Sequence, residues 1–284
     1  MTLTRPQAGG LDPEVPLSVL RRFRITTLEQ GTDDFEVVAH MPASGMHNPF
    51  TGQPSVAALA VLVDDVAGRA NFYRRGEGQW TVSSELSLEM GPGAVESLMA
   101  APEEPVVASA RPLGPGGATW LAVCTLSHRS RVIGGGTVRT VPMSGGPGEP
   151  ERRGDDPLTR TGDTTLAELM AVETSPPDGR TYRLRQHPDP MVNNLIGCVH
   201  GGVSSAGLEL VGAAALNHEQ QSPFRTASLR VNFLRPYVAG SSPGAESAYE
   251  ATALRIGRTS AIADAAAIGP DGRPAVIARV TGYR

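Results

Sequence analysis

The sequence of 284 residues contains no lysine, and all 25 of its cationic side chains are arginine. This absence excludes chemistry that depends on lysine, namely Schiff-base catalysis, anchoring of pyridoxal phosphate and the lysine of phosphate-binding loops. Cysteine is scarce as well, since only Cys124 and Cys198 occur. Two isolated cysteines exclude a disulfide framework and a cysteine-rich metal site. The six histidines show no metal-ligand spacing, so we expect no metal.

Long apolar runs and a strong excess of one charge are missing too. The longest apolar run, Val56–Val63, is far too short to span a bilayer, and residues 1–16 hold no apolar segment typical of a secretory signal. The formal charge is only −4, which provides no basic field for nucleic acid. We therefore expect a cytoplasmic protein that binds no nucleic acid, inserts into no membrane and keeps its cysteines reduced.

One stretch has the composition of a linker. Residues 144–165 consist mainly of Gly, Pro and charged residues, with little to bury. This stretch predicts a first domain over residues 17–143, a linker over 144–165 and a second domain over 166–284. Each domain is long enough to bury a core of its own.

The two predicted domains share one layout. Each contains an apolar, helix-length segment rich in small residues, and each ends in strands that alternate between apolar and polar residues. The expected helices are 55–73 and 203–219. One helix with four or more antiparallel strands, repeated twice, predicts an α+β fold. The expected strands are 21–27, 35–40, 81–89, 106–111, 120–128, 137–141, 181–186, 226–234, 248–256, 261–268 and 275–283, with a hairpin turn at 269–272.

The run from Asn193 to Val203 carries the strongest chemical signal. It reads NNLIGCVHGGV, and Glu209 follows inside an otherwise apolar helix. Gly201 and Gly202 open the helix and leave its first N–H groups unobstructed, and these groups can stabilise developing negative charge on an oxygen. A carboxylate on an apolar helix is costly unless it has a partner or a function.

The motif Asn194-x-x-Gly197-x-x-His200-Gly201-Gly202 resembles the hotdog-fold acyl-CoA thioesterases of the phenylacetate-pathway and 4-hydroxybenzoyl-CoA type. The resemblance continues through the strand at 226–236 and covers the second half. The first half is similar in layout only. The resemblance implies two fused hotdog domains, each a long helix wrapped by a curved antiparallel sheet. It also implies that one unit supplies the Asn and the His-Gly-Gly helix start, whereas the other supplies a helix acid and a Ser or Thr.

Helix geometry agrees with this division of roles. His200 and Glu209 are nine positions apart, which amounts to about 900° of rotation and about 13 Å along the helix axis. The two side chains therefore cannot serve one small reaction centre from the same helix. The acid that works with His200 must come from elsewhere in the chain.

The first half offers such an acid. Glu209 precedes Thr226 by 17 positions, and Asp64 precedes Thr81 by the same number. Nine positions before Asp64 stands Ser55, followed by Val56, so the first half has no His-Gly-Gly. We therefore expect a complete site that joins Asp64 and Thr81 to the second half, and an incomplete site at Glu209. The direct reading of the local motif instead makes Glu209 the catalytic acid, and this alternative stays open.

The expected roles follow from these groups. Gly201 would donate its N–H to the oxyanion, and Asp64 would act as general base or as nucleophile. Asn194 would fix the water or the acid, although it is equally expected as a turn residue, and His200 would shape the helix start. Thr81 would assist by hydrogen bonding. Substrate contacts are expected from Gly202, Thr226 and Arg258, with further arginines at 230, 235 and 255 available for phosphates.

The resemblance thus implies hydrolysis of an acyl-CoA or acyl-carrier thioester, with no cofactor beyond the CoA of the substrate. The resemblance also implies further assembly of chains into a homo-oligomer, since hotdog pairs often present outer sheet edges or faces. Two rivals stay open: a hotdog hydratase or dehydratase, and an acyl-CoA binder without turnover. Release of free thiol would separate the thioesterase from both.

Overall fold

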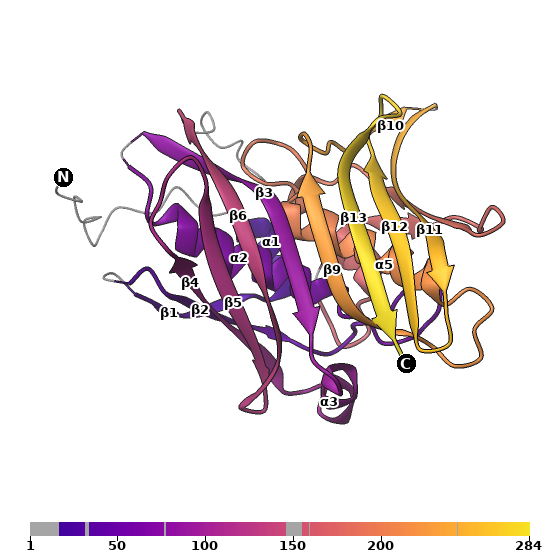
Figure 1. The fold of residues 1–284 in the computed structure, drawn as a ribbon. Coiled ribbons are helices and arrows are strands. Elements are labelled where there is room, and N and C mark those ends of the chain that lie inside the picture. The colour runs from indigo at the N-terminus through magenta and orange to yellow at the C-terminus, as the bar shows by residue number, and fades with distance from the viewer. Residues whose placement is uncertain (1–16, 32–33, 77, 146–154, 159, 243) are drawn as a thin grey trace.

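The computed structural model describes residues 17–31, 34–76, 78–145, 155–158, 160–242 and 244–284. The first half of the chain forms three helices and six strands, coloured indigo to magenta in Figure 1. In chain order they are α1 (Leu17–Phe23), β1 (Thr26–Gln30), β2 (Val37–Pro42), α2 (Ala57–Phe72), β3 (Gln79–Met90), α3 (Ala94–Ala100), β4 (Pro105–Leu113), β5 (Trp120–His128) and β6 (Arg131–Ser144).

The second half repeats this plan with one long helix and a series of strands. Its elements are α4 (Leu166–Met170), β7 (Val172–Thr174), β8 (Thr181–Gln186), the short 3-10 helix η1 (Pro190–Val192), α5 (Gly201–Leu216), β9 (Arg225–Phe233), β10 (Ser241–Ser242), β11 (Ala245–Ile256), β12 (Ser260–Ile268) and β13 (Pro274–Tyr283). The two long helices and the longer strands confirm the α+β prediction.

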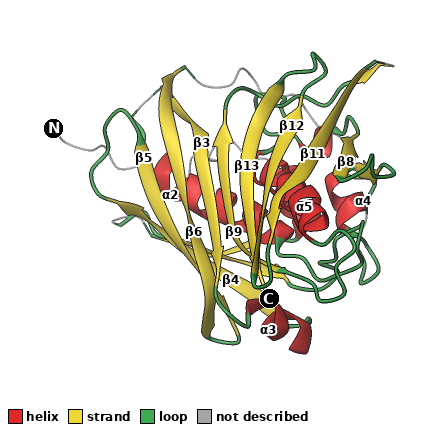
Figure 2. Ribbon diagram, turned by 45° about the vertical axis from the view of Figure 1, so that its right-hand side comes forward, coloured by secondary structure: helices red, strands yellow, loops and turns green. Residues whose placement is uncertain are grey.

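The strands of both halves form one antiparallel sheet in the order β1-β2-β4-β5-β6-β3-β9-β13-β12-β11-β8-β7, and β10 pairs with β11 at the side. The sheet curves around α2 and α5, which lie in its hollow and pack against each other (Figure 2). β3 and β9 join the halves over five residue pairs, from Glu85 opposite Asn232 to Glu89 opposite Ser228. Beyond Glu85 and Asn232 the two strands no longer pair.

Small residues on α5 allow the sheet to approach closely. A side chain at Gly207 would meet the ring of Tyr249 at 2.5 Å, and one at Gly212 would meet Val280 at 2.4 Å. α2 is buried nearly all round, because the sheet covers one side and α5 covers the other. A helix buried on all sides is apolar on all sides, which explains why neither long helix shows a marked polar face.

One strand prediction was wrong. Residues 21–27 were expected as a strand, but Arg21–Phe23 end α1 and the strand β1 begins only at Thr26. The side chains of Val19, Arg22 and Phe23 are buried, as expected of one side of a short helix. The short elements α3, α4, β7, β10 and η1 were not predicted. Among the residues that the structure describes, no helix is long and apolar enough to cross a membrane.

The stretch predicted as a linker is partly packed onto the first half. Arg160 donates hydrogen bonds to the carbonyl oxygens of Phe23 and Ser44, and Asp156 pairs with Arg22 on α1. Residues 146–154 and 159 of this stretch lie outside the described residues.

Candidate active site

The start of α5 is built by His200. Its Nδ1 accepts a hydrogen bond of 3.1 Å from the N–H of Gly202, so the histidine caps the helix. With Nδ1 accepting, the neutral ring carries its proton on Nε2. This bond uses the N–H of Gly202. The N–H of Gly201, the first of the helix, has no acceptor within the helix itself.

Asp64 of the first half lies against this helix start. Its Oδ2 is 3.4 Å from His200 Nδ1, a close contact that is longer than the bond by which Nδ1 caps the helix. A side chain at Gly201 would come within 2.8 Å of the same oxygen. The structure therefore brings together Asp64, His200 and Gly201, the three residues expected from opposite halves of the chain.

Gly202 has a packing role. A side chain there would meet the backbone of α2, at 2.6 Å from the Cα of Val61. The absence of a side chain at Gly202 thus allows the start of α5 to cross α2 closely. Gly202, which was expected to contact substrate, does not line the large cavity beside Asp64.

The hydroxyl that holds Asp64 belongs to Ser83, not to Thr81. Ser83 Oγ donates a bond of 3.0 Å to Asp64 Oδ1. In the second half the corresponding bond, 2.6 Å long, runs from Thr226 Oγ1 to Glu209 Oε1. Thr81 lies two residues earlier on β3 and lines the same cavity as Asp64.

Two β-bulges explain the displacement from Thr81 to Ser83. β3 carries an extra residue at Ser84, opposite β6, and β9 carries one at Ala227, opposite β13. When the bulges are aligned, Ser83 matches Thr226, because each immediately precedes the extra residue. The connection between helix and strand is therefore two residues longer in the first half, and equal counting from the helix acids reaches Thr81.

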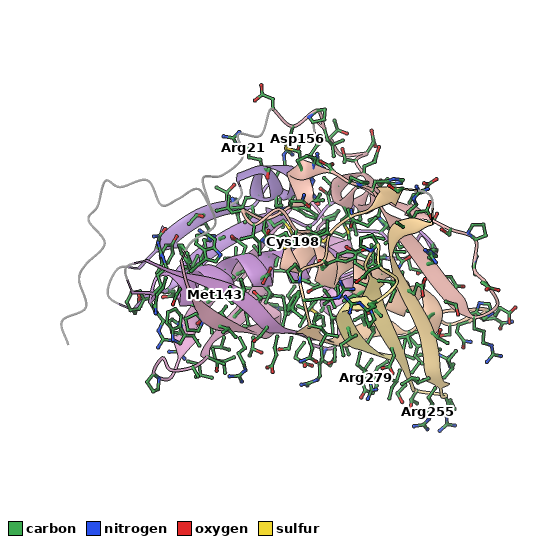
Figure 3. All side chains as sticks on the ribbon, turned by 90° about the horizontal axis from the view of Figure 1, so that it is seen from above. Arg21, Met143, Asp156, Cys198, Arg255 and Arg279 are labelled. Carbon is green, nitrogen blue, oxygen red and sulfur yellow. The ribbon has the colours of Figure 1, made fainter. Side chains whose placement is uncertain are left out.

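A cavity of about 650 Å³ opens above Asp64, where β3 and β9 diverge. Both halves line it, and most of the side chains are apolar. Its edge includes the exposed side chains of Met143, Ile196 and Leu234. Figure 3 shows Met143 on the first half and Cys198, which also lines the cavity, near the junction of the halves. Its apolar lining includes Phe72, Trp80, Val82, Val141, Leu195, Val199, Phe233 and Pro236.

Asn194 shapes the loop that forms one wall of this cavity. Its Oδ1 accepts hydrogen bonds from the N–H groups of Ile196 and Cys198, and its Nδ2 donates to the sulfur of Cys198. These bonds are those of a turn-forming asparagine. Asn194 faces the cavity, and these three bonds join it to its own loop.

Asp65, beside Asp64, is engaged elsewhere. It forms an ion pair of 2.6 Å with Arg69, one helical turn later. Burial raises the pKa of Asp65, and the charge of Arg69 opposes this effect. Both residues line the cavity wall. Of the two neighbouring acids, Asp64 is the one in contact with the start of α5.

Glu209 occupies the equivalent junction at the other end of the helix pair. Its Oε2 accepts a bond of 2.8 Å from Ser55, and its Oε1 accepts the bond from Thr226. Ser55 Oγ also accepts the N–H of Ala57, as His200 does for Gly202. Burial raises the pKa of Glu209, and the two hydroxyl bonds oppose this effect. The adjoining cavity holds only about 10 Å³.

We call the junction at Asp64 the open site (Asp64, Ser83, His200 and Gly201) and the junction at Glu209 the closed site (Glu209, Thr226, Ser55 and Val56). Thr226 was expected to contact substrate, but its hydroxyl is committed to Glu209 in the closed site. Glu209 itself is 1% exposed. The closed site therefore leaves little room for a substrate beside its acid.

The arginine expected at the substrate lies elsewhere. Arg258 is an exposed residue between β11 and β12, and it does not line the 650 Å³ cavity. Arg255 and Arg279 also project outward from the second half, at the lower right of Figure 3. Arg235 does line the cavity, but it is held by Asp271 at 2.6 Å. These arginines lie on different strands and loops that face different regions, and their sequence positions alone do not identify the one near the cavity.

Among the described residues, no three His, Cys, Asp or Glu side chains gather in a way that could hold a metal ion. The open site instead combines a carboxylate, a hydroxyl that orients it and a helix N-terminus, at the base of an apolar cavity. Such a set can activate a water or attack a carbonyl carbon, and can stabilise the negative oxygen that forms.

Comparison with known proteins agrees with this architecture. Residues 196–275 match the profile of the Thioesterase superfamily. Among solved structures, the chain is similar to the tesB protein of Mycobacterium avium subsp. paratuberculosis (12% identity, TM-score 0.58, 95% of this chain and 99% of that one). It is also similar to a hotdog-fold protein from Alicyclobacillus acidocaldarius (14% identity, TM-score 0.58, 94% and 97%).

An acyl-CoA thioesterase II from Mycobacterium marinum matches at 10% identity and a TM-score of 0.53, over 93% of this chain and 97% of that one. A search of curated proteins found no match. At these identities the structural likeness establishes the fold. The chain consists of two fused hotdog units, and its second unit matches the Thioesterase superfamily.

Proposed function

We propose that this double hotdog protein hydrolyses acyl thioesters of CoA, or of a carrier with the same thiol arm, at the open site. The observation that carries the proposal is the contact of Asp64 with the start of α5 beneath the large cavity. The match of residues 196–275 to the Thioesterase superfamily supports the reaction class. The chemistry uses water, a carboxylate and a backbone amide.

In the proposed reaction the thioester carbonyl oxygen points at the N–H of Gly201. The cap formed by His200 consumes the N–H of Gly202 and orients the first turn, so the N–H of Gly201 remains for the substrate. As the carbonyl carbon is attacked, negative charge grows on its oxygen, and the amide and the helix dipole stabilise it.

Asp64 supplies the attack on the carbonyl carbon. In one route it removes a proton from a water molecule that attacks the carbonyl carbon, the C–S bond breaks, and the proton passes to the departing thiolate. In the other route Asp64 itself displaces the thiolate to form an acyl anhydride, and water then hydrolyses the anhydride and supplies the proton that the thiolate takes up. Ser83 holds Oδ1, so Oδ2 is the oxygen presented toward Gly201. The apolar cavity accommodates an apolar acyl group, whose burial contributes about 0.8 kcal/mol for each CH₂.

Free-thiol release from a panel of short, long and aryl acyl-CoAs tests the proposal. Asp64→Asn should lower kcat at least about 100-fold, because the base or nucleophile is lost. Glu209→Gln is the matched control, since it makes the same change at the closed site, and it should keep most of the activity. Loss of turnover in Glu209→Gln alone would overturn the assignment. Saturable binding without thiol release in the unmodified protein would instead indicate a hydratase or a binder.

A further inference from the structure

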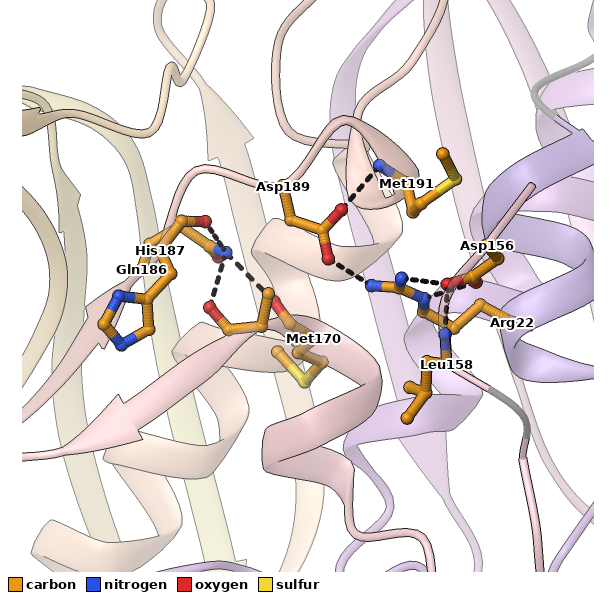
Figure 4. Close-up of polar contacts among 9 residues, drawn as sticks. Arg22, Asp156, Leu158, Met170, Gln186, His187, Asp189 and Met191 are labelled. Carbon is orange, nitrogen blue, oxygen red and sulfur yellow. Dashed lines mark hydrogen bonds and ion pairs between the residues drawn. The ribbon is translucent and has the colours of Figure 1, made fainter. Parts of the chain in front are cut away.

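Arg22 lies outside both sites, yet it connects the two halves of the chain. It belongs to α1 of the first half, and its side chain is 2% exposed. Its guanidinium donates to two carboxylates, as Figure 4 shows. Asp156 accepts from Nε at 2.8 Å and also from Nη2, and Asp189 of the second half accepts from Nη1 at 2.5 Å.

Asp189 is linked to the start of α5 through the short helix η1. Its second oxygen, Oδ1, accepts the N–H of Met191 at 2.8 Å and so caps η1 (Figure 4). The next residue, Val192, accepts the N–H of His200 through its carbonyl oxygen at 2.9 Å. Three short links therefore join Arg22 to the histidine that caps α5.

This series of bonds runs from the first half of the chain to the second. Arg22 and Asp64 both belong to the first half, whereas Asp189, His200 and Gly201 belong to the second. Fixing Asp189 to α1 therefore fixes the start of α5 relative to the half that carries Asp64. Catalysis by a carboxylate and an amide from different halves depends on this relative position, and an error of 1 Å can cost about 100-fold in rate.

Among the residues that the structure describes, the closed site has no equivalent of this ion pair. Asp189 stands eleven residues before His200, and eleven residues before Ser55 stands Ser44. Arg22 is the penultimate residue of α1, and Leu169 is the penultimate residue of α4. Ser44 and Leu169 carry no charge, so within the described parts of the chain these positions beside the closed site form no ion pair.

We propose that Arg22 and Asp189 are positioning residues that hold the start of α5 against Asp64 in the open site. This inference rests on the proposed function, because the positioned groups are those of the proposed reaction. Asp156 binds the same guanidinium but connects it to the stretch predicted as a linker, residues 144–165. Substituting the two aspartates one at a time therefore distinguishes an effect on the position of α5 from an effect on the stability of the fold.

The experiment compares Asp189→Asn with Asp156→Asn. Each asparagine can still accept the backbone N–H that its aspartate accepts, from Met191 or Leu158, but each loses its charge. We expect Asp189→Asn to lower kcat for acyl-CoA hydrolysis about tenfold, with KM within about twofold. Asp156→Asn should keep kcat within about twofold. Thermal unfolding would show whether the two variants are comparably destabilised.

Amide hydrogen exchange provides a readout that does not need turnover. Exchange over residues 199–204 should become faster in Asp189→Asn and stay unchanged in Asp156→Asn. Equal kcat and equal exchange in the two variants would overturn the positioning role. If the unmodified protein releases no thiol from any acyl-CoA, the proposed function fails, and the exchange comparison still decides whether Arg22 and Asp189 hold the start of α5.

Discussion

The open and closed sites are two versions of one junction. In each, a helix acid accepts a hydrogen bond from the hydroxyl of the strand residue before a β-bulge. The acid also faces a residue at the start of the other helix whose side chain accepts a backbone N–H two positions later. The two sites differ in that residue, His200 against Ser55, and in the residue after it, Gly201 against Val56. The open site adjoins a cavity of about 650 Å³ and the closed site one of about 10 Å³.

Neighbouring elements reinforce this difference. α3 follows the end of β3, and its Glu96 lies 3.7 Å from Arg225, which lines the small cavity. Ser97 and His128 hold this helix in place through a contact of 2.9 Å. At the open site, β3 and β9 diverge and leave the cavity. Both carboxylate oxygens of Glu209 accept hydrogen bonds from hydroxyl groups, whereas Oδ2 of Asp64 faces the start of α5.

The largest effect is expected from exchanging Gly201 and Val56, the residues that follow His200 and Ser55 in the two sites. Gly201→Val gives the open site the residue of the closed one. We expect kcat to fall about 100-fold or more, because a side chain at this position meets Asp64 Oδ2 at 2.8 Å and the ring of Phe233 at 3.3 Å, and displaces the oxyanion donor. Free-thiol release measures the effect.

Val56→Gly is the control for that exchange, since it removes a side chain from the closed site. It should leave kcat within about twofold and lower the thermal stability, because Val56 is 1% exposed. Activity that survives Gly201→Val would mean that the first N–H of α5 does not stabilise the oxyanion.

The two strand hydroxyls should have separable effects. Ser83→Ala should lower kcat about tenfold, because the bond that orients the Asp64 carboxylate is lost, and a hydrogen bond to a charged group contributes roughly 1.5–3 kcal/mol. Thr226→Ala should leave kcat nearly unchanged and lower Tm, because it removes a buried bond to Glu209. Kinetics and thermal unfolding of both variants give the answer.

A third variant, Thr81→Ala, addresses the alternative reached by counting along the sequence. It should have a smaller effect on kcat than Ser83→Ala. The reverse order would show that the alignment of the two bulges does not identify the functional hydroxyl.

Sequence reasoning could reach the helices and most strands, because these depend on local periodicity. The meeting of Asp64 with the start of α5 was predictable from the family resemblance, which divides the site between two units, and from the count of residues between helix acid and strand. Ser83 was missed because the two halves differ by two residues between helix and strand, which only the bulges at Ser84 and Ala227 reveal. The strand at 21–27 was wrong because a short amphipathic helix and a strand share apolar spacing over so few residues.

The difference in cavity volume between the open and closed sites could not be predicted from the sequence, for another reason. It depends on where β3 and β9 stop pairing and on the position of α3, and both are tertiary features. The ion pair of Arg22 with Asp189 is similar, since the residues are 167 positions apart and neither stands in a recognisable motif. Polar pairs of this kind become visible only when the chain is folded.

The buried carboxyl group of Glu209 should make the stability of the fold depend on pH. Burial raises its pKa above the ordinary value of 4.5, so the folded protein binds a proton more tightly than the unfolded chain does. The stability of the fold therefore falls as pH rises from about 4.5 toward the pKa of the folded state. Glu209→Gln removes this dependence, so the Tm of the variant minus that of the unmodified protein should increase with pH, by a few degrees.

Thermal unfolding between pH 4.5 and 8 at constant ionic strength measures this difference. A constant difference, or one that decreases with pH, would mean that the bonds from Ser55 and Thr226 outweigh the effect of burial and favour the charged carboxylate.

The smallest effect is expected at Arg258, where the sequence predicted a contact with substrate. Arg258→Ala should leave KM for acyl-CoA within about twofold, because the residue is exposed between β11 and β12 and does not line the cavity. Arg235→Ala is the informative partner, since Arg235 lines the cavity and is held by Asp271. If that ion pair shapes the cavity wall, Arg235→Ala changes KM whereas Arg258→Ala does not. A raised KM in Arg258→Ala alone would place part of the CoA along the outer sheet of the second half.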